Sequence, residues 1–314
     1  MSDIAVSVEH VTKRFNQTTA VDGVSVEIRR GEMFGLIGPD GAGKTTTIRL
    51  VCGLLRPDAG SVRVLGRDPV REHDAITRSV GYLSQRFSLY GDLTIDENIA
   101  FFAEIHGVTG YQTRRDRLLD MTQLTPFRDR LADRLSGGMK QKLALACTLV
   151  HEPQVILLDE PTTGVDPVSR REFWKLLSQF LAQGITIVMA TPYLDEAERC
   201  SRVALLSEAR LLVTDRPDTL RADLPGTIVE VIATPQQAAM AALGAVPGIA
   251  EVQNFGERIH ARIEAPGTGP AGTLAAVRAA LDRPGIDVTG LRSVQASLED
   301  VFINRVMEAK AVRP

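Results

Sequence analysis

The residues best suited to chemistry lie in a glycine-rich segment near the N-terminus. Gly38 to Thr45 reads GPDGAGKT, the pattern G-x-x-x-x-G-K-[ST] of a phosphate-binding loop, between the apolar run 33–37 and the helix-like run TTIRLVCGLL. Glycines let backbone N–H groups turn toward a triphosphate, and the helix that follows directs its positive end at the anion. Lys44 supplies a charge for the β- and γ-phosphates, and Thr45 a hydroxyl for Mg²⁺. A glycine-rich turn without a ligand is disfavoured, because both the preceding strand and the following helix are present.

Two adjacent carboxylates end a second apolar run. Val155 to Glu160 reads VILLDE, and four successive apolar residues are typical of a strand buried on both faces of a parallel sheet. An acid at the end of such a strand lies beside the phosphate loop. We therefore expect Asp159 to hold the Mg²⁺ hydration shell and Glu160 to polarise the attacking water. Solvated acids at a strand end are the alternative for an isolated pair, but here PTTGVDP follows and another motif precedes.

That motif, LSGGMKQK, occupies Leu135 to Lys142. Ser136 is predicted to cap the following helix, whose apolar residues fall on one face. Gly137 and Gly138 leave bare backbone at the N-terminus of that helix. The chain therefore has a second candidate anion site, and nothing in the sequence indicates that its own phosphate loop can reach it.

Along the chain the order is phosphate loop, Gln85, LSGG, DE and GVDP. This order resembles that of the ATP-binding cassette (ABC) family over about the first 220 residues. In that family two cassettes face each other head to tail, and the LSGG of one closes over the nucleotide held by the other. The resemblance implies that Gln85, in GYLSQRF, senses Mg²⁺ and the membrane partner, and that Asp166, in GVDP, belongs to the inter-cassette loop. It also implies that Phe15 stacks on adenine, although alone this residue would more often be in a core. Val165 stands where leucine is usual.

The expected ligands are ATP and Mg²⁺. Catalysis is assigned to Lys44, Gln85 and Glu160. Magnesium binding is assigned to Thr45, Gln85 and Asp159. The residues expected to contact nucleotide are Phe15, Gly38, Pro39, Asp40, Gly41, Ala42, Gly43, Lys44, Thr45, Thr46, Ser136, Gly137, Gly138 and Asp166.

One residue expected from the resemblance is missing. The family has a histidine just before YLDEAE that contacts the γ-phosphate and holds the water-activating glutamate, whereas this chain has Pro192. Proline has no N–H and no side-chain donor, so it cannot do this work. The other histidines, at 10, 73, 106, 151 and 260, lie in unrelated segments. Two interpretations stay open: a water or Thr191 partly substitutes and hydrolysis is slower, or this chain is the weak half of an asymmetric pair.

The composition fits a cytoplasmic enzyme. The 314 residues can hold more than one core, and a net charge of −3 with 44% hydrophobic residues argues against disorder and against a polybasic nucleic-acid binder. Charged residues interrupt every apolar run before it reaches bilayer length, and the N-terminus has acids where a signal peptide needs an apolar core. Cysteines 52, 147 and 200 form no C-x-x-C pair, so we expect free thiols and no zinc site.

The elements that must position the motifs are predicted from periodicity. Residues 24–28 alternate between apolar and polar, which predicts a half-exposed strand before the phosphate loop. Beyond Gln85 the pattern becomes helical, and Thr94 with Glu97 forms a capping box. A helical subdomain is therefore expected at about residues 86–150.

Aromatic residues accompany the start of this subdomain. The segment 86–93 reads RFSLYGDL and follows Gln85 directly. It offers a groove for a cytoplasmic helix of a membrane partner. A small satellite core around Phe87 and Tyr90 is an equally weighted alternative.

A second domain is predicted at residues 223–314, after the turn Leu224-Pro225-Gly226. Alternation and capping signals predict strands at 227–233, 251–255, 258–264 and 286–291, and helices at 236–243, at 274–281 and from Ser297. The order β-α-β-β-α-β-α is ferredoxin-like, with a loop APGTGP before the second helix. The domain holds no catalytic cluster and resembles the C-terminal extension of drug- and antibiotic-export cassettes, which implies a role in dimer contact or regulation.

The predicted fold is therefore an α/β cassette at residues 1–222, a P-loop NTPase core with antiparallel β and helical subdomains, followed by a small α+β domain. The resemblance implies the ATPase subunit of an exporter of drug-like or hydrophobic compounds. It would act as a homo- or heterodimer of cassettes with a separate membrane permease. The chain would lie at the cytoplasmic face, touch the membrane only through the permease and bind no nucleic acid. The alternative is a nucleotide-gated regulatory module, slow in hydrolysis because of Pro192.

Overall fold

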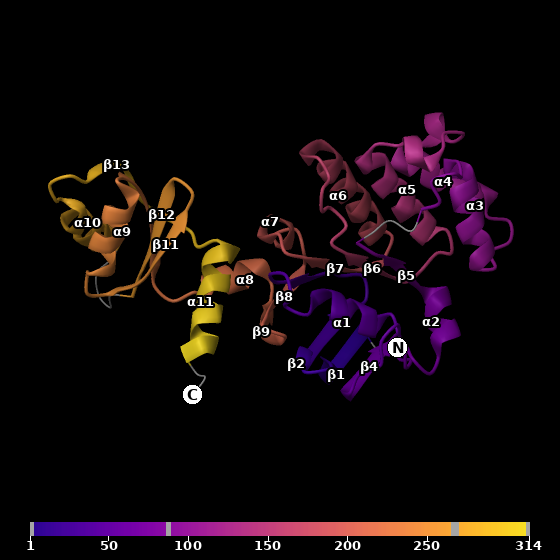
Figure 1. Cartoon of the computed structure of the whole chain (residues 1–314), viewed down its shortest axis with the longest axis horizontal. Helices are drawn as coiled ribbons and strands as arrows, with labels where there is room; N and C mark the ends of the chain where they lie inside the picture. Colours follow the sequence, from indigo (N-terminus) through magenta and orange to yellow (C-terminus); the bar gives the residue numbers. More distant parts are fainter. Residues whose placement is uncertain (1–2, 86–88, 265–269, 312–314) are drawn as a thin grey trace. The chain divides into compact units, whose positions relative to one another are not determined.

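The computed structural model describes residues 3–85, 89–264 and 270–311, and the chain separates into two compact units (Figure 1). One unit ends at Pro217 and the other comprises Asp218–Ala311. Each unit has a hydrophobic core of its own. Among the described helices, none combines the length and apolar character that a membrane span requires.

A six-stranded sheet forms the centre of the first unit. Its order is β5-β6-β7-β3-β8-β9, parallel except for β9. The strands are β3 (Met33–Ile37), β5 (Val80–Leu83), β6 (Val155–Asp159), β7 (Thr186–Thr191), β8 (Arg202–Ser207) and β9 (Arg210–Asp215). Every residue of β3, β6 and β7 is buried, as continuous apolar runs predict. Because β7 lies between β3 and β6, the carboxyl ends of these three strands meet at one edge of the sheet.

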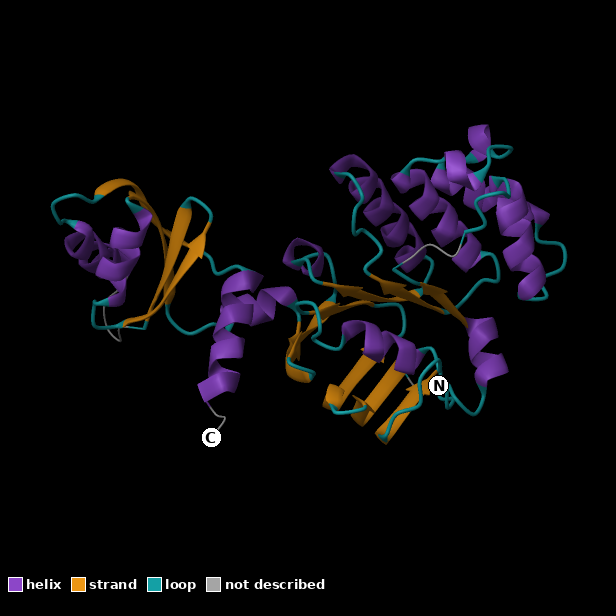
Figure 2. Ribbon diagram, viewed as in Figure 1, coloured by secondary structure: helices purple, strands orange, loops and turns teal. Residues whose placement is uncertain are grey.

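A smaller antiparallel sheet supports the central one. It has the order β2-β1-β4, with β1 (Ile4–Phe15), β2 (Thr18–Arg29) and β4 (Ala59–Val64). The strand expected at residues 24–28 is the second half of β2, and its burial alternates as predicted. Helix α1 (Lys44–Val51) lies between the two sheets (Figure 2) and contacts strands of both. The helix that follows the phosphate loop is therefore packed on two sides.

The helical subdomain lies on the other face of the central sheet (Figure 1). It contains α3 (Ile95–Ile105), α4 (Gln112–Thr122), α5 (Gly137–Leu149) and two short 3₁₀ turns, Thr125–Phe127 and Ala132–Arg134. The remaining helices of this unit are α2 (His73–Ser79), α6 (Pro167–Ala182) and α7 (Leu194–Ala197). The antiparallel sheet, the helical subdomain and the parallel core confirm the predicted cassette architecture.

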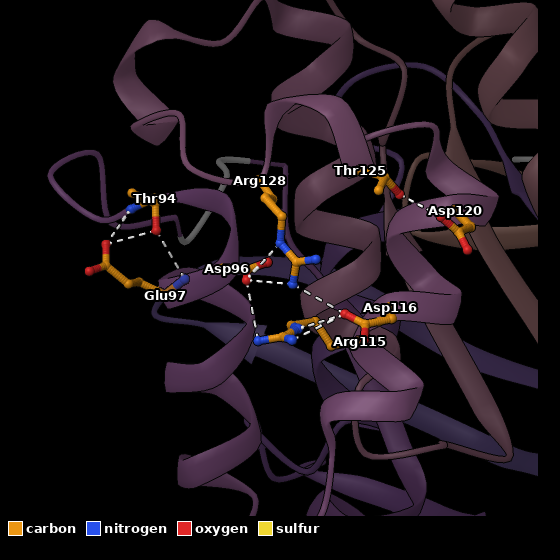
Figure 3. A network of polar contacts seen from close by, with 8 residues as sticks. All are labelled: Thr94, Asp96, Glu97, Arg115, Asp116, Asp120, Thr125 and Arg128. Carbon is orange, nitrogen blue, oxygen red and sulfur yellow. Dashed lines mark hydrogen bonds and ion pairs between the residues drawn. The ribbon is translucent and has the colours of Figure 1, made fainter.

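Polar contacts fasten α3 to the rest of the subdomain (Figure 3). The predicted capping box is present, since the Thr94 hydroxyl accepts from the Glu97 backbone and the Glu97 carboxylate accepts from the Thr94 backbone. The Asp96 carboxylate pairs with Arg128 at 2.7 Å and with Arg115 at 3.2 Å. These groups are partly exposed, so solvent weakens each pair. Together they tie the start of α3 to α4 and to the turn at Arg128.

Of the two aromatic residues expected to form a satellite core next to Gln85, the structure describes only Tyr90. Phe87 lies outside the described residues. Tyr90 packs edge-on against Phe101 with 4.5 Å between ring centres, although 46% of Tyr90 is exposed. Asn98 donates to and accepts from the Tyr90 backbone, which ties this turn to α3.

The second unit is a four-stranded antiparallel sheet with helices. Its elements are α8 (Pro217–Ala222), which begins at the boundary, β10 (Thr227–Thr234), α9 (Gln236–Gly244), β11 (Ile249–Phe255), β12 (Arg258–Ile263), α10 (Pro270–Leu281), β13 (Asp287–Val294) and α11 (Leu298–Ala311). The sheet order is β11-β12-β10-β13. The core forms on one face, where Val229, Val231 and Ile259 are buried with residues of α9 and α10. The expected APGTGP loop lies almost wholly outside the described residues.

Candidate active site

The phosphate loop runs from the end of β3 into α1. Gly43 has φ 98°, a left-handed conformation, and a Cβ there would lie 2.4 Å from the Ala20 carbonyl oxygen. A Cβ at Gly38 would lie 2.2 Å from the Leu206 carbonyl oxygen. The backbone path of this loop therefore requires glycine at both positions.

Lys44 turns back into the loop that it follows. Its ammonium donates to the carbonyl oxygens of Gly38 at 2.8 Å and Pro39 at 3.0 Å, and the side chain is only 4% exposed. The Glu160 carboxylate lies 3.5 Å away. The ammonium is thus held inside the loop by two carbonyls and one carboxylate, where a phosphate that enters the loop would meet it.

Thr45 and Asp159 come together from segments more than a hundred residues apart. The Thr45 hydroxyl donates to the Asp159 carboxylate at 2.8 Å, and the Tyr82 hydroxyl approaches its other oxygen at 3.4 Å. Burial, followed by the Asp159 charge, raises the pKa of Tyr82, so it remains a neutral donor. Among the described residues no group of three or more His, Cys, Asp or Glu could hold a metal. One hydroxyl and one carboxylate fit Mg²⁺, which keeps several waters and shares the phosphates of its substrate.

Glu160 lies at the centre of a set of donors. It has φ 49°, a left-handed conformation that turns its side chain away from the line of β6. Gln85 Nε2 donates to Glu160 Oε2 at 3.0 Å, and Lys44 Nζ lies 3.5 Å from Oε1. The three residues assigned to catalysis are therefore in one cluster.

A third contact to this carboxylate was not expected from the sequence. The Thr163 hydroxyl lies 3.4 Å from Glu160 Oε2. Thr163 belongs to the segment PTTGVDP, in which the sequence assigned a role only to Asp166. Its sequence signal is only its distance of three residues from Glu160, which permits a turn.

The loop after β7 holds Pro192 at the edge where β3, β7 and β6 end. Thr191 precedes it and is fully buried: its hydroxyl donates to Glu196 at 2.7 Å and accepts from the Tyr193 backbone at 3.1 Å. Thr162 also donates to Glu196. The hydroxyl of Thr191 is therefore committed to Glu196, and the suggestion that it replaces the missing histidine does not hold for this structure.

The second candidate anion site lies at the start of α5. Ser136 caps this helix by accepting from the Met139 backbone at 3.3 Å, as expected. A Cβ at Gly138 would lie 2.2 Å from Ser169 Oγ of α6, whereas a Cβ at Gly137 would meet nothing within 4 Å. In the described part of the chain, no hydrogen bond or ion pair joins Ser136 to the phosphate loop.

Asp166 caps the neighbouring helix α6. Its carboxylate accepts from the Val168 and Ser169 backbones, both at 3.0 Å. Hydrogen bonds from the Ser169 side chain and backbone lower the pKa of Asp166, so it is ionised at neutral pH. An exposed acid at the start of α6 can therefore meet another molecule.

The remaining predicted residues lie around the loop without closing a pocket on their own. Phe15 ends β1 and is 44% exposed, with the Lys13 ammonium 5.5 Å from its ring centre. Pro39 and Asp40 are exposed, Gly41 has φ 80°, Ala42 is buried and Thr46 is half-buried. Phe15 is thus the exposed ring that a flat base could cover.

The comparisons with known proteins concern mainly the first unit. The ABC transporter family model matches residues 21–163. The chain is 47% identical over 230 residues to "Probable multidrug ABC transporter ATP-binding protein YbhF" of Escherichia coli, which covers 72% of this chain and 40% of that protein. It is 33% identical over 316 residues to "Daunorubicin resistance ATP-binding protein DrrA3" of Streptomyces coeruleorubidus, covering 100% and 99%.

A solved structure gives the same likeness in three dimensions. It is cbiO1 of Clostridium perfringens, described as part of the ABC transporter complex cbiONQ, with a TM-score of 0.65 and 29% identity. The match covers 71% of this chain and 92% of that one. This chain thus spans two-fifths of the E. coli relative and nearly all of the Streptomyces one.

Proposed function

The chain belongs to the ABC transporter family, and we propose that it binds and hydrolyses ATP as the energy-supplying subunit of an exporter. The observation that carries this proposal is the cluster of Lys44, Gln85 and Glu160 at the carboxyl edge of the sheet. The Thr45–Asp159 pair lies at the same edge. A phosphate loop, a magnesium pair and a candidate base are thus brought to one place.

Each residue of the cluster has a separate proposed role in ATP hydrolysis. Lys44 exchanges the carbonyls of Gly38 and Pro39 for the β- and γ-phosphates, while the N–H groups at the start of α1 hold the remaining oxygens. Thr45 and Asp159, with Gln85, would hold Mg²⁺, which would neutralise phosphate charge. Glu160 takes the proton of the water that attacks the γ-phosphorus, and ADP leaves as the bond to the γ-phosphate breaks.

A second cassette completes the site in this proposal. The backbone around Ser136 and Gly137 is open and is not joined to the chain's own phosphate loop. A helix N-terminus without an anion partner in its own chain suits a nucleotide held by a neighbour. Asp166 would meet the partner at the same interface.

A membrane permease is the proposed second partner. A pocket of about 250 Å³ lies between the helical subdomain and the core, lined among others by Leu54, Tyr82 and Phe102. Tyr82 is close to Gln85 in the chain, so a permease helix seated there could act on the Gln85 contact with Glu160. The chain would then lie at the cytoplasmic face, reach the membrane only through the permease and bind no nucleic acid.

The class of cargo is proposed from relatives. The E. coli relative is named for multidrug transport and the Streptomyces one for daunorubicin resistance. We therefore assign drug-like or hydrophobic compounds as the exported class. The permease would convert closing and opening of the cassettes into alternating access.

The test is isolation of the chain from membranes with its partners. A tagged chain solubilised in mild detergent should retain a membrane protein, and MgATP hydrolysis by the complex should rise when a transported drug is added. A Lys44→Ala chain, which keeps the docking surface but not the nucleotide contact, should retain the same membrane protein without hydrolysis. Retention of a ribosome, DNA or a soluble partner in its place would favour the regulatory module.

A further inference from the structure

The carboxylate of Glu160 must stay correctly aimed while ATP is bound. In the described part of the chain its side chain has three contacts: Gln85 at 3.0 Å, Thr163 at 3.4 Å and Lys44 at 3.5 Å. Under the proposed function, Lys44 would bind the phosphates and Gln85 would help to hold Mg²⁺. Thr163 is then the one donor of the three that nothing else requires.

The position of Thr163 is set by a short turn. Its backbone N–H donates to the Glu160 carbonyl at 3.3 Å, which closes residues 160–163 into a turn with Pro161 at its second position. The turn separates two adjacent threonines. Thr162 is buried and donates to Glu196, whereas Thr163 is on the exposed side and its hydroxyl faces the Glu160 carboxylate.

Other donors near the site are already committed. Thr191 donates to Glu196, and Pro192 has no donor to offer. His106 and His151 stack on each other with 3.9 Å between ring centres, and His151 bonds to the Val80 carbonyl. In the described residues, no hydrogen bond or ion pair joins a histidine to Glu160.

We propose that Thr163 is a positioning residue that holds the Glu160 carboxylate during hydrolysis. It supplies the donor to Glu160 that Pro192 lacks. This inference rests on the proposed ATPase function. A hydroxyl that donates to a carboxylate restricts the rotation of that carboxylate. The contact of 3.4 Å is long, as hydrogen bonds in catalytic sites often are before the substrate is in place. Thr163 keeps its own proton throughout, and Glu160 accepts the proton of water.

The experiment compares Thr163→Val, which removes the hydroxyl with little change of shape, with Thr163→Ser, which keeps it. Loss of a hydrogen bond to a charged group predicts a fall in kcat of about tenfold for Thr163→Val, with KM for ATP changed less than about twofold. Thr163→Ser should restore kcat, because it keeps the hydroxyl that donates to Glu160.

The chain offers a matched control. Thr125 on the helical subdomain also donates to a carboxylate, that of Asp120 at 2.6 Å (Figure 3). Thr125→Val removes the same kind of bond away from the site, so kcat and KM for ATP should stay as in the wild-type chain. Thermal midpoints of all variants show whether any of them is damaged in folding.

Three results would overturn the proposal. They are an unchanged kcat in folded Thr163→Val, a loss of ATP affinity equal to the loss of kcat, or no recovery in Thr163→Ser. Glu160→Gln separates this failure from failure of the proposed function. If Glu160→Gln stops hydrolysis while Thr163→Val is normal, only the positioning role is wrong; if Glu160→Gln is also normal, the assigned chemistry is wrong.

Discussion

Lys44 and Glu160 face each other across 3.5 Å, although the strands that precede them, β3 and β6, are separated in the sheet by β7. The ammonium therefore neutralises the candidate base until a phosphate competes for it. This competition links nucleotide binding to release of the Glu160 carboxylate. It also gives the two residues distinct and separable effects.

Glu160→Gln should keep ATP binding and slow hydrolysis on the order of 10²-fold or more, because the amide cannot accept the proton of water. Lys44→Ala should lose ATP binding, because it removes the charge that meets the phosphates. Equilibrium binding of a fluorescent ATP analogue and steady-state phosphate release measure the two effects. Normal turnover in Glu160→Gln would remove that residue from the mechanism.

The LSGG signature, residues 135–138 at the start of α5, allows a test of action on the nucleotide of a neighbouring cassette. Gly137→Asp should abolish ATP-driven dimerisation and leave ATP binding to the monomer intact, because it places an acid against a triphosphate at a helix N-terminus. Its Cβ position is open, so the monomer should remain folded. Light scattering with MgATP measures dimerisation. Equal loss of monomer affinity would mean that the signature acts on the chain's own nucleotide.

Gly138 provides the structural contrast. A Cβ at Gly138 would collide with Ser169 of α6. Gly138→Ala should therefore destabilise the monomer by about 1–3 kcal/mol, which urea unfolding measures. A Gly138→Ala chain as stable as the wild type would mean that α5 and α6 can move apart at low cost.

The elements of the site differ in how far the sequence could predict them. The phosphate loop is continuous in the chain, so its strand, turn and helix could be predicted from spacing alone. The contact of Gln85 with Glu160 joins residues 75 positions apart. The resemblance to a family pointed to Gln85 but not to this contact. Thr162 and Thr163 are adjacent and have the same side chain, so the sequence does not distinguish their roles. The turn that closes on Glu160 directs Thr162 toward Glu196 and Thr163 toward Glu160.

The second unit shows the same limit on a larger scale. Its element order could be predicted because alternation and capping residues are local signals. The order of the strands and the bond that joins α11 to β12 depend on distant pairings that no local pattern specifies. Arg262, on the polar face of β12, is only 8% exposed, and its neighbour His260 bonds to Asp300 of α11.

This His260–Asp300 bond predicts a pH dependence. Nδ1 of His260 lies 2.9 Å from the Asp300 carboxylate, and this bond, with the nearby charges of Asp300 and Glu230, raises the pKa of His260. A pKa raised by folding adds stability that is complete below the unfolded value of about 6.5 and is lost as pH rises through the folded value. Hydrogen exchange protection of α11 should therefore fall as pH rises above neutrality, after correction for intrinsic exchange.

His260→Gln should remove this pH dependence while leaving the rest of the chain protected. His73→Gln, at an exposed histidine of α2 in the other unit, is the control and should leave α11 unchanged. Protection of α11 that stays constant across this pH range in the wild-type chain would show that His260 does not hold the helix.

Pro192 gives the last prediction, because it lies at the strand edge between the phosphate loop and Glu160 and has no donor for either. The isolated chain should bind MgATP normally and hydrolyse it slowly. Pro192→His should raise kcat with little change in nucleotide Kd, since Thr191 and Glu196 can keep their bond and hold the loop. The gain should be larger in a Thr163→Val background, where the imidazole replaces the lost donor as well as the γ-phosphate contact.

A partner cassette, if the working dimer is asymmetric, should carry a histidine at this position. The site closed by the Ser136 signature of this chain is then the competent one. Fast hydrolysis by a purified wild-type homodimer would refute the idea, because both of its composite sites contain Pro192. A Pro192→His chain that is folded and no faster would mean that the absent donor does not limit the rate. The backbone of the loop would limit it instead, since the bond from Tyr193 N to the Thr191 hydroxyl fixes that backbone.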